Sequence, residues 1–153
     1  HDIKDVDFIK IDTQGAELEI FQGGDNTVSN AVMLVSEVEF IKMYKHQPLY
    51  HDVARHLKER AFILYRLMGL CGRALKPALL DNNVFAPSQL MFTDAIFIKN
   101  IYKPDSLSSE QLLKLGILAF TYSSVDLGLF CLKQYDQRHR SSLADKSFQA
   151  AWG

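Results

Sequence analysis

Cysteine is scarce in this chain of 153 residues, which contains only Cys71 and Cys131. The two residues lie far apart and form no C-x-x-C motif. Because 48% of the residues are hydrophobic and 11% are aromatic, the chain can bury a core without disulfide bonds. We therefore expect both thiols to be reduced and mostly buried, and the composition excludes a small disulfide-stabilised domain.

The chain also lacks an excess of charge of either sign. It has 17 Lys and Arg residues and 18 Asp and Glu residues, which gives a formal net charge of −1. No overall field therefore attracts nucleic acid or an anionic membrane surface. We expect no nucleic-acid partner and no membrane partner, so any binding must depend on local groups.

An uninterrupted hydrophobic run of membrane-spanning length is missing too. The longest apolar stretch, residues 112–132, is broken by Lys114 and Asp126. Each of these charges would cost roughly 2.5 to 3.5 kcal/mol at the centre of a bilayer. No signal-peptide pattern is recognised at the start of the chain. We therefore expect a soluble, cytoplasmic protein.

Hydrophobic patterning predicts an α/β region in the first two thirds of the chain. Apolar runs predict strands, helical spacing predicts helices, and the irregular stretch Gly69–Thr93 predicts a long loop. Gly23 and Gly24 are expected to end the first helix with a left-handed turn. The predicted strands are 6–11, 31–40, 61–67 and 94–99, and the predicted helices are 16–21 and 51–60.

The order of these elements predicts a mixed sheet. Right-handed crossovers make the first three strands parallel, whereas the last two strands, with no helix between them, should be antiparallel. Beyond Pro104, a capping box at Ser108–Gln111 and leucines at helical spacing predict two helices that form a hairpin, followed by a polar tail. We place the domain boundary between residues 1–103 and 104–153.

Asp12 is the leading candidate for a site residue. Ligands of open α/β sheets bind at the carboxyl ends of the strands, and Asp12 follows the first strand directly. A carboxylate there can position a ligand or accept a proton from a hydroxyl group. The alternative is that Asp12 caps the helix that begins near Gly15. We expect Gln14 and Gly15 to shape the turn, while Glu17 could either belong to the site or be favoured only by the helix dipole.

Glu37 and Glu39 have the same parity in the second strand, so both should project to one face near Asp12. Three carboxylates there could hold a divalent cation, could bind the hydroxyl groups of a sugar, or could simply be solvated. His51 and His56 lack the i, i+4 spacing of helical zinc ligands. We expect no metal.

The segment after the second strand predicts a loop that binds the substrate. Tyr44, His46, Gln47 and Tyr50 combine hydrogen-bonding groups with aromatic surfaces, which suits a sugar or another oxygen-rich acceptor. His46 could act as a general base near neutral pH, although an exposed histidine without a role is the alternative.

Three segments resemble one known family. Residues 10–17 read Lys-Ile-Asp-Thr-Gln-Gly-Ala-Glu and resemble the Lys-Ile-Asp-x-x-Gly-Ala-Glu signature of the FkbM-family methyltransferases. Glu37–Phe40 with the 44–52 segment, and Asp94–Phe97, are similar to later parts of the same family. The resemblance covers about residues 5–103. It implies a Rossmann-like class I methyltransferase fold, in which the final strand is antiparallel.

The resemblance also implies a function and roles for the residues. Asp12, Gln14 and Gly15 would contact S-adenosyl-L-methionine, with Asp12, Glu37 and Glu39 as catalytic residues. The reaction implied is methylation of a hydroxyl group on a sugar or a secondary metabolite, that is, on a small-molecule or glycan acceptor.

One part of the family pattern is missing. The family places a glycine-rich loop after its first strand and an acidic residue after its second, whereas Gly23 and Gly24 follow a helix. We therefore expect a C-terminal portion of such an enzyme, without the N-terminal cofactor-binding half and inactive alone. The alternative is a noncatalytic fragment or interaction module. An unpaired first strand could further produce a homo-oligomer.

Overall fold

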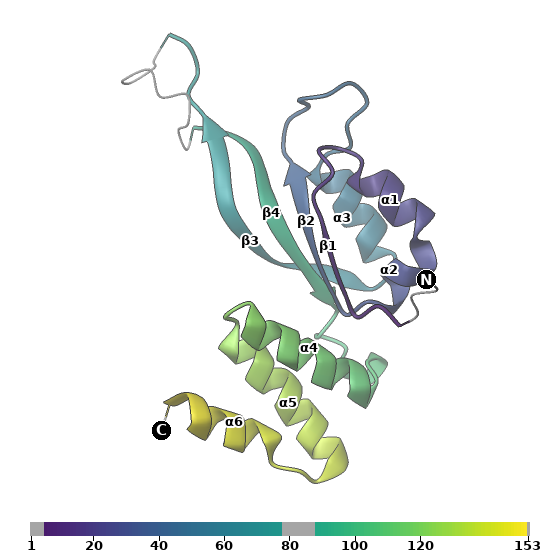
Figure 1. Ribbon diagram of the computed structural model, residues 1–153, viewed down its shortest axis with the longest axis vertical. Coiled ribbons are helices and arrows are strands. Elements are labelled where there is room, and N and C mark those ends of the chain that lie inside the picture. Colours follow the sequence, from purple (N-terminus) through teal and green to yellow (C-terminus); the bar gives the residue numbers. More distant parts are fainter. Residues whose placement is uncertain (1–4, 78–87, 153) are drawn as a thin grey trace. The chain divides into compact units, whose positions relative to one another are not determined.

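A computed structural model describes residues 5–77 and 88–152 of the chain (Figure 1). The chain divides into two compact units, residues 1–98 and 99–153. The first unit is a sheet with helices, and the second consists of helices.

The first unit is built on a four-stranded mixed sheet. Its strands are β1 (Phe8–Ile11), β2 (Met33–Glu39), β3 (Phe62–Arg73) and β4 (Gln89–Lys99), in the order β1-β2-β4-β3. β1 is parallel to β2, β2 is antiparallel to β4, and Figure 1 shows β3 and β4 running in opposite directions. The predicted directions of the strands are therefore confirmed. The last strand lies between the second and the third, which leaves β1 at an edge.

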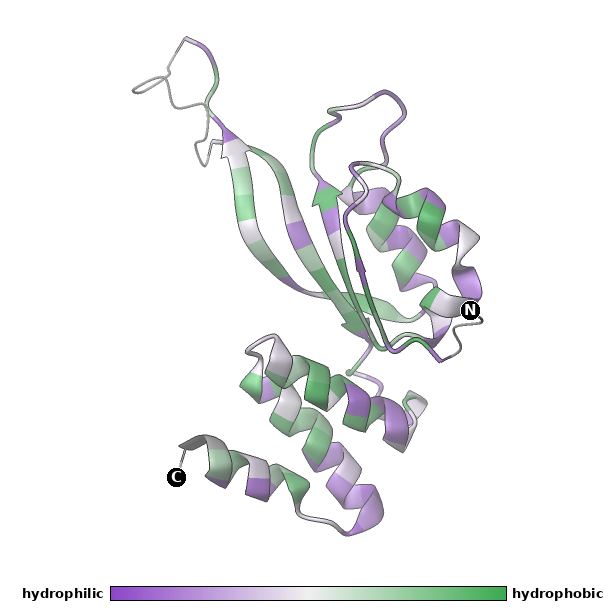
Figure 2. Ribbon diagram, in the orientation of Figure 1, coloured by the Kyte–Doolittle hydropathy of each residue, from purple (hydrophilic) through white to green (hydrophobic). Residues whose placement is uncertain are grey.

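Three helices cover one face of this sheet: α1 (Glu17–Gly23), α2 (Asp25–Asn30) and α3 (Tyr50–Lys58) (Figure 1). Alternate residues of the strands point toward them, because successive side chains of a strand face opposite sides. The hydrophobic residues of β2 and of the C-terminal part of β4 are visible in Figure 2. The core beneath the helices comprises Ile11, Phe21, Val28, Ala31, Leu34, Val38, Val53, Leu57, Phe62, Ala95 and Phe97.

The glycine pair does not end the first helix as predicted. Gly23 is the last residue of α1, and Gly24 has φ −101° rather than a left-handed conformation. α2 begins immediately after Gly24 and was not predicted. Its sequence, Asp-Asn-Thr-Val-Ser-Asn, consists mostly of poor helix formers, and only Val28 is buried. The short helix therefore packs through this one residue, and its sequence has no helical periodicity that could have predicted it.

The predicted loop Gly69–Thr93 was too long at both ends. β3 continues to Arg73 and β4 begins at Gln89, while residues 78–87 lie outside the described residues. The Thr93 hydroxyl donates a hydrogen bond of 3.0 Å to the Met68 carbonyl oxygen, across the two strands. Gly69 has φ +67° inside β3, and such a glycine weakens the sequence signal for a strand.

The second unit contains the predicted helical hairpin. α4 (Ser109–Thr121) and α5 (Val125–His139) pack together after a short 3₁₀ helix, η1 (Pro104–Ser106). The predicted capping box is confirmed: Gln111 N–H donates to Ser108 Oγ at 3.1 Å, and Ser108 N–H donates to Gln111 Oε1 at 2.9 Å. Cys131 is buried and Cys71 is half-buried, and neither forms a disulfide bond.

The polar tail contains one more helix, α6 (Leu143–Trp152), which the sequence pattern did not predict. Asp136 of α5 accepts hydrogen bonds from the backbone N–H groups of Leu143 (2.9 Å) and Ala144 (2.8 Å). The start of α6 is thus capped by a residue of the preceding helix. Within residues 5–77 and 88–152, no helix has the length and hydrophobicity needed to cross a membrane.

Candidate functional site

The turn between β1 and α1 is held by a side chain of the helix that follows it. Glu17, the first residue of α1, is only 1% exposed. One of its carboxylate oxygens accepts hydrogen bonds from the backbone N–H (2.8 Å) and the hydroxyl (3.0 Å) of Thr13, and the other accepts from Gly15 N–H (2.9 Å). Gln14 and Gly15 have φ of +55° and +106°. Both residues therefore shape the turn, as expected, and glycine is the residue that best tolerates positive φ.

The side chain of Gln14 joins two of the predicted site residues. Its Nε2 atom donates to Asp12 Oδ1 at 2.8 Å and to Glu37 Oε1 at 3.1 Å. The ends of β1 and β2 thus bring their carboxylates to the same edge of the sheet. The Asp12 carboxylate accepts no backbone N–H in the part of the chain that the structure describes, so the interpretation of Asp12 as a helix cap is wrong. Glu17 binds the backbone of this turn instead.

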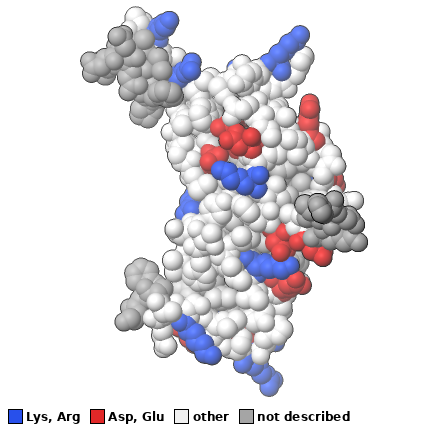
Figure 3. Space-filling model, in the orientation of Figure 1, with Lys and Arg blue, Asp and Glu red and all other residues white. Residues whose placement is uncertain are grey.

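Glu37 lies among other acids. Burial raises its pKa, as do the negative charges of Asp12, Asp94 and Glu17, while the Gln14 hydrogen bond lowers it. Asp94 is its partner residue on β4. Figure 3 shows acidic side chains grouped near the ends of β1 and β2, with basic atoms beside them in that view.

Glu39 is buried more deeply than Glu37. It is 2% exposed, and burial followed by the charges of Glu17 and Glu37 raises its pKa to about 7. The Gln47 amide opposes this effect, although no hydrogen bond of normal geometry joins the two side chains. Glu39 Oε1 and Gln47 Nε2 are buried polar atoms without hydrogen-bond partners among the described residues.

Gln47 connects the loop after β2 to the turn after β1. Its Oε1 accepts hydrogen bonds from the N–H groups of Met43 (2.8 Å) and Tyr44 (3.1 Å). Its Nε2 and Cγ lie 3.1 Å and 3.2 Å from the position that a Cβ on Gly15 would occupy. The side chain of Gln47 therefore packs against Gly15, where a Cβ would be in the way.

The other residues of the predicted substrate loop lie elsewhere. Tyr44 and His46 are exposed, and His46 has φ +62°. Tyr50 begins α3 and packs against the core, with its ring centroid 5.9 Å from that of Phe40. Of the four residues, only Gln47 is shown next to the turn.

The carboxylates do not form a metal site in the described residues. Across residues 5–77 and 88–152, no group of three or more His, Cys, Asp or Glu side chains is arranged to hold a metal ion. No Lys, Arg or His of the same residues forms an ion pair with Asp12, Glu17, Glu37 or Glu39.

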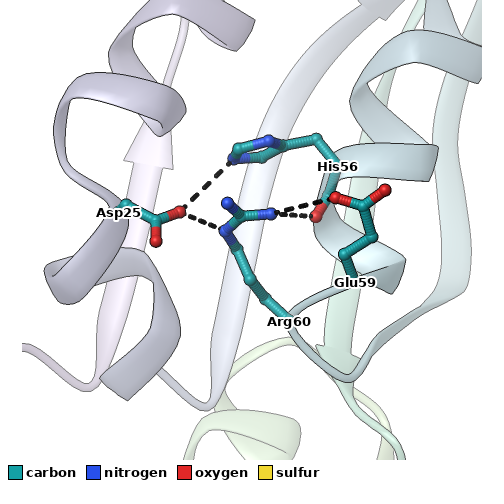
Figure 4. Close-up of polar contacts among 4 residues, drawn as sticks. All are labelled: Asp25, His56, Glu59 and Arg60. Atoms are coloured by element: carbon teal, nitrogen blue, oxygen red, sulfur yellow. Dashed lines mark hydrogen bonds and ion pairs between the residues drawn. The ribbon is translucent and has the colours of Figure 1, made fainter.

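A second polar cluster, away from this edge, links two helices (Figure 4). Arg60 Nε, just after α3, forms an ion pair with Asp25 of α2, and Arg60 Nη1 donates to the His56 carbonyl oxygen at 2.7 Å. The buried His56 lies 3.9 Å from Asp25, and burial lowers its pKa. The cluster stabilises the contact between α2 and α3.

Two acidic residues of the site differ from the expectation: the role of Glu17 was left open, and Asp94 was not expected there. The contact of Glu17 with the turn could have been predicted, because Glu17 lies two residues after Gly15 and can reach the backbone N–H groups of the turn. The place of Asp94 could not have been predicted, because it depends on the register of β4 against β2.

Comparison with known protein families finds a similarity for the first part of the chain. Residues 1–64 match the family model of the methyltransferase FkbM domain, and this segment includes the turn, Glu37, Glu39 and Gln47. No curated protein and no solved structure matches the chain. Residues 1–64 are therefore similar to the methyltransferase FkbM domain.

Proposed function

We propose that the protein is part of an S-adenosylmethionine-dependent methyltransferase that methylates a hydroxyl group of a sugar or secondary metabolite. The observation that carries this proposal is the family match over residues 1–64, within which Gln14 bridges Asp12 and Glu37 at the sheet edge. Carboxylates at this edge suit an acceptor with hydroxyl groups to donate.

The topology supports a Rossmann-like methyltransferase fold. The order β1-β2-β4-β3, with an antiparallel last strand inserted between its neighbours, is the arrangement expected for the second half of that sheet. β1 would then pair on its free edge with an earlier strand of the fold.

The residues present fit one side of the cofactor only. The negative charges around Asp12 and Glu37 suit a sulfonium cation, and the Asp12–Gln14–Gly15 turn would hold it. The chain has no glycine-rich loop between a strand and a helix. These residues therefore offer no such loop for the adenosine.

The proposed chemistry is a displacement at carbon. S-adenosylmethionine, when bound, supplies an electrophilic methyl group. An acceptor hydroxyl that took this methyl group in place of the sulfur would have to give up its proton, so a proton acceptor is needed beside it. Asp12 is exposed and Glu37 is half-exposed, so these carboxylates take the proton, while Gln14 fixes their separation. Glu39 completes the set of catalytic residues from a buried position.

The loop after β2 would bind the acceptor. We assign this role to Tyr44, His46, Gln47 and Tyr50. Gln47 is the anchor, because its side chain contacts the turn at Gly15.

Asp12→Asn tests this function in a longer chain that carries a glycine-rich strand–loop–helix ahead of β1. Asn keeps Oδ1 as the acceptor for Gln14 but removes the charge, so kcat should fall about 100-fold or more with little change in stability. Transfer of labelled methyl groups to a panel of glycans and hydroxylated metabolites measures the rate. Asp105→Asn, at an exposed position, is the matched control. A wild-type rate for Asp12→Asn would make Asp12 structural.

Glu37→Gln and Glu39→Gln separate acceptor from cofactor effects. Each should raise the acceptor KM or lower kcat and leave the affinity for S-adenosylmethionine nearly unchanged. An equal loss of cofactor affinity would reverse the assignment. If the longer chain methylates no acceptor, a noncatalytic interaction module becomes the better interpretation.

A further inference from the structure

Gln47 is buried although it lies in a polar loop. It is 4% exposed, whereas Tyr44, three residues earlier, is 53% exposed. A glutamine in a loop is usually solvated, because its amide loses hydrogen bonds to water when it is buried. The side chain of Gln47 must therefore make contacts inside the protein that offset this cost.

The oxygen of this side chain fixes the shape of the loop. Gln47 Oε1 accepts hydrogen bonds from the backbone N–H groups of Met43 (2.8 Å) and Tyr44 (3.1 Å), which uses both lone pairs of an amide oxygen. The Gln47 N–H also donates to the Tyr44 carbonyl oxygen at 3.4 Å, and His46 between them has φ +62°. Residues 43–47 are thus closed into a turn around one side chain.

The rest of the Gln47 side chain packs on the turn after β1. Its Nε2, Cγ and Cδ atoms lie 3.1, 3.2 and 3.4 Å from the position that a Cβ on Gly15 would occupy. Figure 1 shows the loop after β2 and the turn after β1 at the same end of the sheet, as the parallel pairing of the two strands requires. Gln47 therefore holds the loop against Gly15.

Gly15 belongs to a turn that is itself held by hydrogen bonds. Its N–H donates to the buried Glu17 carboxylate at 2.9 Å, and Thr13 donates to the same carboxylate twice, at 2.8 and 3.0 Å. Gln14 lies between these two donors, and its amide bridges the carboxylates at the ends of β1 and β2. A change at Gln47 can therefore reach the bridge through Gly15.

A ligand reaches other residues of this loop before Gln47. Gln47 Oε1 already accepts two hydrogen bonds, and Gln47 Nε2 is buried. Tyr44 and His46 are exposed on the same loop. The part that Gln47 plays in the loop is therefore to position these residues.

We propose that Gln47 is a positioning residue that locks the loop after β2 to the turn after β1, through its packing on Gly15. The loop and the turn then form one rigid body, and loosening the loop also loosens the Gln14 bridge. For methyl transfer, the acceptor loop is ordered against the cofactor turn before any acceptor binds, and only this consequence rests on the proposed function.

Nitrogen-15 NMR relaxation of the 153-residue chain tests the lock without cofactor or acceptor. In the wild type, the backbone amides of Met43, Tyr44 and Gly15 should have order parameters of about 0.85, the value of a rigid backbone. Gln47→Ala should lower those of Met43 and Tyr44 to below about 0.6. It should also lower the order parameters of Gly15 and of the Gln14 side-chain amide, to which Gln47 makes no hydrogen bond.

Gln22→Ala is the matched control. Gln22 is exposed on α1, so its loss should leave all of these order parameters unchanged. Order parameters report fast local motion, so a lower global stability alone would not change them. The response of the Gln14 amide therefore separates positioning from a general loss of stability.

Two results would overturn the proposal. One is a wild type whose Met43 and Tyr44 amides already have order parameters below about 0.6, which needs no variant and so holds even if Gln47→Ala fails to fold. The other is a folded Gln47→Ala protein whose Gly15 and Gln14 values equal those of Gln22→Ala, because Gln47 would then order its own loop alone. Since the relaxation measurement needs no methyl transfer, a failure of the proposed enzyme activity would leave it unaffected, and the two failures can be told apart.

Discussion

Gln47 packs directly against Gly15, with its Nε2 atom 3.1 Å from the place where a Cβ on Gly15 would lie. The loop after β2 can pack against the turn after β1 because residue 15 has no Cβ. Gly15 also has φ +106°, a conformation that residues with a Cβ rarely adopt. The contact therefore depends on glycine for two independent reasons.

Gly15→Ala should destabilise the first unit by about 1 to 3 kcal/mol, because the new methyl group is strained at this φ and displaces Gln47. Because the chain divides into two compact units, hydrogen exchange of the β2 amides is the measurement that reports on the first unit. Gly23→Ala is the matched control. A Cβ at Gly23 meets no atom within 4 Å, and alanine there should be neutral or stabilising by about 0.5 to 1 kcal/mol. Equal effects of the two substitutions would contradict the contact.

Glu39 should make the stability of the first unit fall as the pH rises. Its pKa in the folded protein is about 7, above the ordinary value of 4.5. The stabilisation associated with its protonated form is therefore complete below pH 4.5 and is lost as the pH rises through about 7. Glu39→Gln should remove this dependence and raise stability at pH 8 by about 1 to 3 kcal/mol, while changing it little at pH 4.

Denaturation of the Glu39→Gln and wild-type proteins at several pH values measures this difference. Glu19→Gln, which changes an exposed acid on α1, should reproduce the wild-type profile. Parallel profiles for the wild type and Glu39→Gln would show that Glu39 is ionised at low pH in the folded protein.

Asp25→Asn should weaken the contact between α2 and α3 by about 1 kcal/mol, because it removes the charge that pairs with Arg60 while Asp25 itself is half-exposed. Glu59→Gln is the control. Glu59 lies 3.7 Å from Arg60 but is largely exposed, so its loss should have an effect below about 0.5 kcal/mol. Urea denaturation followed by hydrogen exchange in α2 and α3 compares the two. A larger effect of Glu59→Gln would show that Glu59, and not Asp25, carries the charge that stabilises this contact.

The sequence predicted those parts of the fold that depend on local pattern. The apolar run before Asp12 predicted β1, and the Ser108–Gln111 pair predicted the start of α4. Asp12 and Glu37 were expected at one sheet edge because both follow or end parallel strands, and Gln14 joins them there. Strand direction and parity suffice for such a prediction.

The parts that the sequence did not predict depend on contacts between distant residues. α2 has weak helical propensity and includes the Asp25 that pairs with Arg60. Asp94 reaches the site through the β2–β4 register. Glu17 was ambiguous because its sequence position fits both a solvated helix start and the buried contacts that it makes. No local pattern distinguishes these outcomes.

S-adenosylmethionine should bind the 153-residue chain weakly, because the chain supplies groups near the methyl group but no glycine-rich loop for the adenosine. Each polar group of the ligand that is buried without a partner costs roughly 1 to 3 kcal/mol, so the loss of several contacts lowers the affinity by several orders of magnitude. Calorimetry should show no saturable binding at micromolar concentration. A longer chain with a glycine-rich strand–loop–helix ahead of β1 should bind, and Gly15→Ala in that chain should weaken binding through the displaced turn. Saturable micromolar binding by residues 1–153 would mean that these residues hold the adenosine through contacts other than a glycine-rich loop.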